Sequence, residues 1–539
     1  MVTKYNALLT GILFIVLFTS ACGGAPAATQ APAATEPSTY DYIPEESVST
    51  EAPAATGIPA LEAPAGVDPS TSDVTPPNPP ANREPYDMFF ENYGVNPSID
   101  TEDDRLSTFA LDVDTGSYTI MRNYLSEGNL PPSDSVRVEE YVNYFEQGYP
   151  SPPPHQAFGI YVDGAPAPFT QSERYQMLRV GIQGYQVPEE ERKDASLTFV
   201  IDVSGSMDMD NRLGLVKRSL ELLVEQLRPY DRVSIVVYGS DARVVLEPTS
   251  GSEKGQILEA IYSLHPEGAT NAEAGIRLGY QMAMRAYNPE GINRVILCSD
   301  GVANVGETGP EAILEEVRHY VEENVTLTTI GFGMDNYNDV LMEQLADNGD
   351  GFYAYVDDPR EARRLFIDQI TGTLQTIAMD AKVQVEFNPA VVMRYRLVGF
   401  ENRAIADHQF RDNSVDAGEI GAGHSVTALY EIKLYPEAYG NIATVFMRWQ
   451  DPDTRQVVEL SKDFGTGELV GDFEYADPYF RRSVIVAEYA EILKKSYWAE
   501  ESSLGYVYHE AIRVSELVAW DENMGEFMEL IRRASQLTD

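Results

Sequence analysis

Basic residues are scarce in this sequence. It has 39 Lys and Arg residues against 85 Asp and Glu residues, which gives a formal net charge of −46 at pH 7. Such an acidic chain repels phosphate backbones and anionic headgroups everywhere except at a local basic patch, so nucleic acid is excluded as the expected partner. The acidity favours solubility, and it also raises the local concentration of divalent cations near a suitable site.

Cysteine is nearly absent, since the chain has only Cys22 and Cys298, and the two lie in very different settings. Cys298 ends the apolar run 295–298, where a free thiol behaves as a small buried hydrophobe. We therefore expect Cys298 to be unpaired and chemically inert, and Cys22 needs a separate explanation.

Long apolar runs are also missing outside the N-terminus, and no other stretch reaches the roughly 18 apolar residues that a transmembrane helix needs. Residues 1–21 contain Lys4, the apolar run 8–18 and small residues before Cys22, which predicts a secretory signal peptide. The cysteine after small residues resembles the bacterial lipobox, which implies that Cys22 is lipidated and becomes the mature N-terminus. Thr19 departs from the aliphatic residue usual at its position, so plain secretion and an uncleaved anchor remain alternatives.

Residues 22–85 are dominated by Pro, Ala, Thr, Ser and Glu. This composition cannot bury enough apolar surface to offset the entropy of the chain, which predicts a disordered stalk. The stalk would hold the folded part clear of the membrane.

The central segment, residues 195–373, alternates apolar runs with amphipathic stretches, as in a parallel sheet covered on both faces. The expected strands are 197–202, 232–238, 243–246, 294–299, 325–331 and 352–356. The expected helices are 212–227, 254–264, 272–287, 311–323, 338–346 and 359–370. The pattern predicts a doubly wound, Rossmann-like α/β domain.

Polar residues gather where these strands end, which is where open sheets of this kind bind ligands. The first strand ends in Asp202, followed by Ser204 and Ser206; Thr270 lies in a later loop, and Asp300 follows the fourth strand. This order resembles the metal-ion-dependent adhesion site (MIDAS) of von Willebrand factor type A (VWA) domains. Asp-x-Ser-x-Ser alone is a weak signal, but its place at a strand end and the later Thr and Asp make it specific.

The resemblance implies a Mg²⁺ site, with Mn²⁺ or Ca²⁺ as alternatives. Ser204, Ser206 and Thr270 would offer neutral hydroxyl oxygens, and Asp202 and Asp300 would act directly or through water, which suits a hard cation. The ion would then keep much of its positive charge, and an Asp or Glu carboxylate of a partner protein would complete its coordination.

The flanking segments extend the resemblance. Residues 86–190 are expected to form an α+β N-terminal domain, and residues 374–539 a β-rich C-terminal domain with terminal helices. The stretches 109–118, 130–132 and 136–145 of the first segment and the stretch 416–430 of the second resemble the domains that flank VWA in bacterial YfbK-like lipoproteins, which predicts a multidomain α/β protein. Asp112-x-Asp114 imitates a metal loop but lacks the calcium-loop spacing, so it is interpreted as a strand-to-helix turn.

The leading functional hypothesis is an extracytoplasmic, lipid-anchored adhesion or scaffold module without enzymatic activity. One alternative is a structural envelope protein in which the metal only staples loops. The other is a metal-assisted hydrolase, for which His265 and Glu267 would be the natural bases. The sequence has no His-Glu-x-x-His or Gly-x-Ser-x-Gly motif, and it shows no second set of metal ligands.

Overall fold

The computed structural model describes residues 88–170, 172, 174–301, 310–333, 337–415, 417–518 and 521–538. The expected signal peptide, Cys22 and the stalk lie outside this range. Among the described residues, no helix has both the length and the apolar character needed to cross a membrane.

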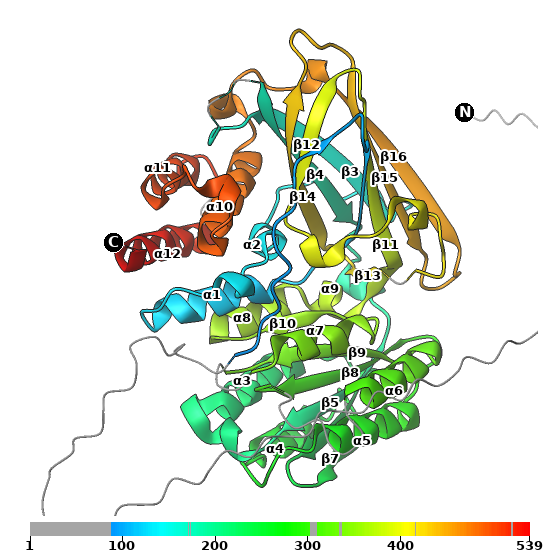
Figure 1. Ribbon diagram of the computed structural model, residues 1–539. Coiled ribbons are helices and arrows are strands. Elements are labelled where there is room, and N and C mark those ends of the chain that lie inside the picture. The colour runs from blue at the N-terminus through cyan, green and yellow to red at the C-terminus, as the bar shows by residue number, and fades with distance from the viewer. Residues whose placement is uncertain are drawn as a thin grey trace, which may run out of the picture. The chain divides into compact units, whose positions relative to one another are not determined.

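A six-stranded sheet forms the central segment (Figure 1). Its order is β10-β9-β8-β5-β6-β7, and all neighbours are parallel except the edge strand β7, which runs antiparallel to β6. The strands are β5 (Ala195–Asp202), β6 (Arg232–Tyr238), β7 (Ala242–Ser250), β8 (Ile292–Ser299), β9 (Thr326–Gly331) and β10 (Tyr353–Tyr355). The doubly wound, Rossmann-like fold predicted from the sequence is confirmed, while the antiparallel edge strand β7 makes the sheet mixed rather than wholly parallel.

Helices cover both faces of this sheet because its central strands are apolar on both sides. The cluster on one face includes residues of α3 and α4, and the cluster on the other includes residues of α5, α6 and α7. These helices are α3 (Arg212–Gln226), α4 (Lys254–Tyr262), α5 (Ala272–Arg285), α6 (Pro310–Glu322) and α7 (Asp339–Asp347). Cys298 is fully buried in β8, and burial raises the pKa of its thiol, as expected for an inert cysteine.

The last helix of this segment differs from the prediction of one continuous helix over residues 359–370. The chain forms α8 (Pro359–Arg363), then a wider π-helical turn (Arg364–Asp368), then α9 (Ile370–Leu374). Such turns interrupt the ordinary hydrogen-bond ladder of a helix without reversing the chain, and the apolar spacing in the sequence does not reveal them.

The segments before and after the central sheet share two further sheets. One has the order β1-β12-β14-β4-β3; in the other, β2 pairs with β11 beside β13, β15 and β16. The early strands are β1 (Ile99–Asp100), β2 (Leu106–Ala110), β3 (Phe158–Pro166) and β4 (Tyr175–Gly184). The late strands are β11 (Thr376–Phe387), β12 (Val392–Val398), β13 (Gly418–Gly421), β14 (Ser425–Leu434), β15 (Asn441–Gln450) and β16 (Val457–Gly465).

This pairing corrects the division into separate N-terminal and C-terminal domains over residues 86–190 and 374–539. Nine register positions join β4 to β14, and five join β2 to β11. One apolar core contains side chains of both regions, among them Phe109, Leu178, Val383 and Tyr430. The central segment is therefore inserted between two halves of a single β-structure.

Five helices pack together beside the first of these sheets (Figure 1). They are α1 (Gly116–Ser126), α2 (Val138–Asn143), α10 (Pro478–Lys494), α11 (Leu504–Ser515) and α12 (Glu522–Thr538). Their shared core includes Tyr141, Tyr489 and Phe527, together with Leu429 of β14. Asp112 and Asp114 lie in the turn from β2 to α1, which confirms the strand-to-helix interpretation.

Buried arginines connect the central segment to its flanks. Arg122 of α1 pairs with Asp357 before α8, with Glu361 of α8 and with Glu526 of α12. Arg403, after β12, contacts two carboxylates in the turn before α1 and two on α7. Removing one partner of such a buried ion pair lowers the stability of the fold, because the remaining charge stays buried without compensation.

Glu139 of α2 gives the contact between the early and late flanking segments a pH dependence. It is only 2% exposed; its Oε2 accepts the Phe400 N–H at 2.9 Å, while its Oε1 has no hydrogen-bond partner among the described residues. Burial, together with the charge of Glu401, raises the pKa of Glu139 to about 7. The folded protein therefore binds a proton that the unfolded chain releases near its ordinary pKa.

We expect Glu139 to contribute about 1 kcal/mol to the rise in the free energy of unfolding when the pH falls from 8 to 6, because a raised carboxyl pKa stabilises the folded state as protons bind. Urea unfolding at both pH values measures this. Glu139→Gln keeps an oxygen for the Phe400 N–H and removes the titration, so its pH slope should be flatter by about that amount. An unchanged slope in the variant would contradict the assignment to Glu139.

Candidate metal site

Asp202 occupies the carboxyl end of β5, a strand in which every residue is buried. Its Oδ1 accepts the backbone N–H of Ser204 at 2.8 Å, and its Oδ2 accepts the Ser299 hydroxyl at 3.0 Å. Burial, together with the charge of Asp300, raises the pKa of Asp202 to about 6, although the hydrogen bonds from Ser204 and Ser299 act in the opposite direction. The carboxylate is thus fixed in position and poorly compensated in charge.

The two serines of the motif lie directly beyond this carboxylate. The hydroxyl oxygens of Ser204 and Ser206 are 3.0 Å apart, and the chain continues as a 3-10 turn over Gly205–Asn211 into α3. Ser204 is buried and Ser206 is partly exposed, so the pair extends from the interior towards the surface.

The loop carrying Thr270 is held against this turn by backbone hydrogen bonds. The Gly205 N–H donates to the Gly268 carbonyl at 3.3 Å, and the Asn271 N–H donates to the Gly239 carbonyl at 2.9 Å. Thr270 lies between these contacts and is half-buried. Within the described part of the chain, no hydrogen bond joins its hydroxyl to the other four predicted ligands, and its place in the set rests on the backbone alone.

Asp300 follows β8, the strand beside β5, and is 4% exposed. Its Oδ2 accepts a hydrogen bond from an Arg212 guanidinium nitrogen at 2.8 Å. The structure therefore gathers Asp202, Ser204, Ser206 and Asp300 at one end of the sheet, as their order in the sequence predicts. It also adds an arginine at the first position of α3.

The donor set fits a hard divalent cation. It consists of two carboxylates and three hydroxyls, all oxygen ligands, of which Mg²⁺ takes about six including water. Among the described residues, no group of three or more His, Cys, Asp or Glu side chains could hold a metal. The predicted set contains only two such side chains, because its other three ligands are hydroxyl groups. Its use of a metal stays a prediction.

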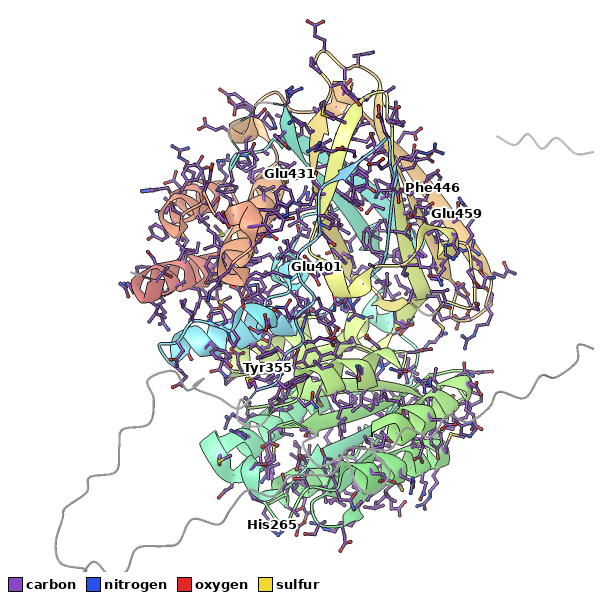
Figure 2. All side chains as sticks on the ribbon, in the orientation of Figure 1. His265, Tyr355, Glu401, Glu431, Phe446 and Glu459 are labelled. Carbon is purple, nitrogen blue, oxygen red and sulfur yellow. The ribbon has the colours of Figure 1, made fainter. Side chains whose placement is uncertain are left out.

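His265 and Glu267, the candidate bases of a hydrolase, are a solvent-exposed pair. His265 is 67% exposed and lies 3.9 Å from Glu267, whose other carboxylate oxygen pairs with Arg243. Figure 2 shows His265 at the edge of the central segment. Asp208 is exposed in the first turn after the motif, which agrees with an electrostatic role at the start of the helix.

Two polar residues of the site were not identified from the sequence. Ser299 directly precedes Asp300 at the strand end, so its position could have suggested it. Arg212 is 88 residues away from Asp300 along the chain, and no local pattern predicts the direction of its side chain.

Three family models match the chain. The von Willebrand factor type A domain matches residues 196–369, a model described as von Willebrand factor matches residues 84–179, and the C-terminal domain of uncharacterized protein YfbK matches residues 372–439. The first match covers the six-stranded sheet and the predicted metal ligands. The third begins within α9 and continues into the shared sheets.

Two curated relatives extend these matches. Uncharacterized protein YfbK of Escherichia coli is 41% identical over 388 residues, which cover 70% of this chain and 66% of that protein. Uncharacterized protein sll0103 of Synechocystis is 29% identical over 202 residues, or 38% of this chain and 46% of that protein. The chain thus spans somewhat less than two thirds of the first relative and about half of the second.

Among solved structures, a von Willebrand factor type A protein from Catenulispora acidiphila aligns with 69% of this chain and 89% of its own, at 16% identity and a TM-score of 0.41. VWA domains generally serve protein interaction and adhesion. From the sheet topology and the family matches, the chain is a YfbK-like protein in which a VWA domain is followed by the YfbK C-terminal domain.

Proposed function

We propose that this protein binds a partner protein through a divalent cation held by Asp202, Ser204, Ser206, Thr270 and Asp300. The observation that carries the proposal is the buried Asp202 carboxylate beside Asp300 and two hydroxyls 3.0 Å apart. Mg²⁺ is the proposed ion, with Mn²⁺ or Ca²⁺ as alternatives. An ion held largely by neutral hydroxyls retains positive charge, which a carboxylate from a partner can meet.

The same arrangement favours binding over catalysis. A metal-assisted hydrolase needs a base placed to activate water. Glu267, one of the two candidate bases, forms an ion pair with Arg243. We therefore propose no enzymatic role.

The proposal includes anchoring through Cys22. This part rests on the sequence alone, because Cys22 lies outside the described residues. Lipidation of Cys22 would tether the protein on the outer side of a membrane, and the acidic chain would not adhere to anionic headgroups by itself. The partner would then be another envelope or surface protein that presents an Asp or Glu side chain.

The test is capture of partners from envelope extracts by the purified protein in Mg²⁺ and in EDTA. We expect at least one protein to be retained in Mg²⁺, lost in EDTA and lost with Asp202→Ala. Asp208→Ala is the matched control, since it removes an exposed carboxylate six residues away and should retain the partner. The same recovery from wild type in both buffers, and from Asp202→Ala, would refute metal-bridged binding and leave a loop-stapling metal as the better explanation.

A further inference from the structure

Arg212 is a buried cation beside the predicted metal ligands. It is 3% exposed, and its guanidinium donates to Asp300 Oδ2 at 2.8 Å. An arginine beside a cation site weakens metal binding, because like charges repel. Its presence here therefore calls for a role other than attracting the metal.

The surroundings of Arg212 are shaped to admit it. Gly333, just after β9, has a φ of +89°, and a Cβ there would lie 2.2 Å from Arg212 Nε. Any side chain at residue 333 would therefore displace the guanidinium. The Arg212 side chain thus spans from the start of α3 to the ends of β8 and β9.

We propose that Arg212 is a positioning residue that holds Asp300 by one oxygen and offsets its charge, so that a bound divalent cation stays electrophilic towards a partner's carboxylate. This inference rests on the proposed metal-binding function. Without the guanidinium, Asp300 would present its full charge to the ion. With it, part of that charge is taken up by the hydrogen bond from Arg212 to Asp300 Oδ2.

Removing Arg212 distinguishes the proposed role from a purely structural one. The two roles predict different effects on the affinity for the metal and on the affinity of the loaded metal for an anion. An arginine that only supported the loop would, once removed, weaken the metal site and everything bound to it. An arginine that sets the charge of the site should, once removed, leave metal affinity unchanged or higher and weaken the binding of an anion to the loaded metal.

The experiment uses Mn²⁺ as the metal and acetate as the carboxylate. Calorimetry gives the affinity for Mn²⁺, and the relaxation of water protons reports acetate displacing water from the protein-bound ion. For Arg212→Gln we expect Mn²⁺ affinity at or above that of wild type and acetate affinity lower by about tenfold. Arg212→Lys should recover most of the lost acetate affinity because it restores the charge.

Two further variants keep the test decisive. Gly333→Ala retains the arginine and displaces its guanidinium, so it should lower acetate affinity even if Arg212→Gln fails to fold. Arg243→Gln removes an exposed arginine paired with Glu267 and should leave acetate affinity within about twofold of wild type.

The outcomes are distinct. A fall in Mn²⁺ affinity in Arg212→Gln that matches the fall in acetate affinity would overturn the inference, as would unchanged acetate affinity. Failure of wild type itself to bind Mn²⁺ would refute the proposed function and the inference together.

Discussion

We expect Arg403→Leu to lower the free energy of unfolding by about 3 to 5 kcal/mol at pH 8, the cost typical of leaving buried charges without their partner. Arg403 lies within 3.4 Å of carboxylate oxygens on Asp112, Asp114, Glu343 and Asp347, and the first three side chains are at most 7% exposed. Burial already raises the pKa of Asp114 and of Glu343, so their charged forms depend on the arginine.

The loss should shrink as the pH falls from 8 to 6, because raised carboxyl pKa values let protons replace the missing cation in the folded state. Urea unfolding at both pH values measures this. Arg411→Ala is the matched control: Arg411 is 58% exposed and pairs with Glu459, so its loss should cost less than about 1 kcal/mol. Equal losses in the two variants would show that the cluster around Arg403 does not stabilise the junction.

Arg122→Leu should cost a similar amount, about 3 to 5 kcal/mol, because it leaves Asp357 and Glu361 buried beside each other. Burial raises the pKa of Asp357 to about 6 even with Arg122 present. Tyr144 would lose a hydrogen bond from the same guanidinium at 2.8 Å. Figure 2 marks the neighbouring Tyr355, which accepts a hydrogen bond from Asn123 of α1.

The double variant Arg122→Leu with Asp357→Leu tests this explanation directly. Replacing both partners of a buried pair by apolar groups removes the uncompensated charge, so it should recover at least half of the loss. Chemical denaturation of the single and double variants provides the measurement. If the loss in the double variant equals the sum of the losses in Arg122→Leu and Asp357→Leu, the cost comes from packing rather than from unpaired charge, and this explanation is wrong.

The strands and helices of the VWA domain could be predicted because their signals are local. The sequence places one strand at residues 232–238, the bounds that β6 has in the structure, and another at 294–299, which lies within β8. Apolar alternation over a few residues determines such elements regardless of their partners. The strand partners could not be predicted, because nothing in the pattern of residues 106–110 identifies residues 382–386 as their neighbours.

The site divides in the same way. Asp202, Ser204 and Ser206 lie within five residues, and their motif can be recognised without a structure. Thr270 and Asp300 were named from the resemblance to VWA domains, and the structure adds that β8 lies beside β5 and that Gly268 joins the loop of Thr270 to Gly205. Arg212 could not be found, because a long side chain can point in several directions and tertiary packing selects one of them.

The shared sheets also determine the order in which the chain can finish folding. All strand partners of β5 to β10 lie between residues 195 and 355, so the six-stranded sheet can form as soon as that stretch has been synthesised. β4 is made earlier, but it must wait for β14, about 250 residues later, and until then only β3 covers one of its edges. An uncovered strand edge invites pairing with other chains. During synthesis, the first half of this β-structure is therefore the part most in need of protection, while the inserted six-stranded sheet already has all its strands.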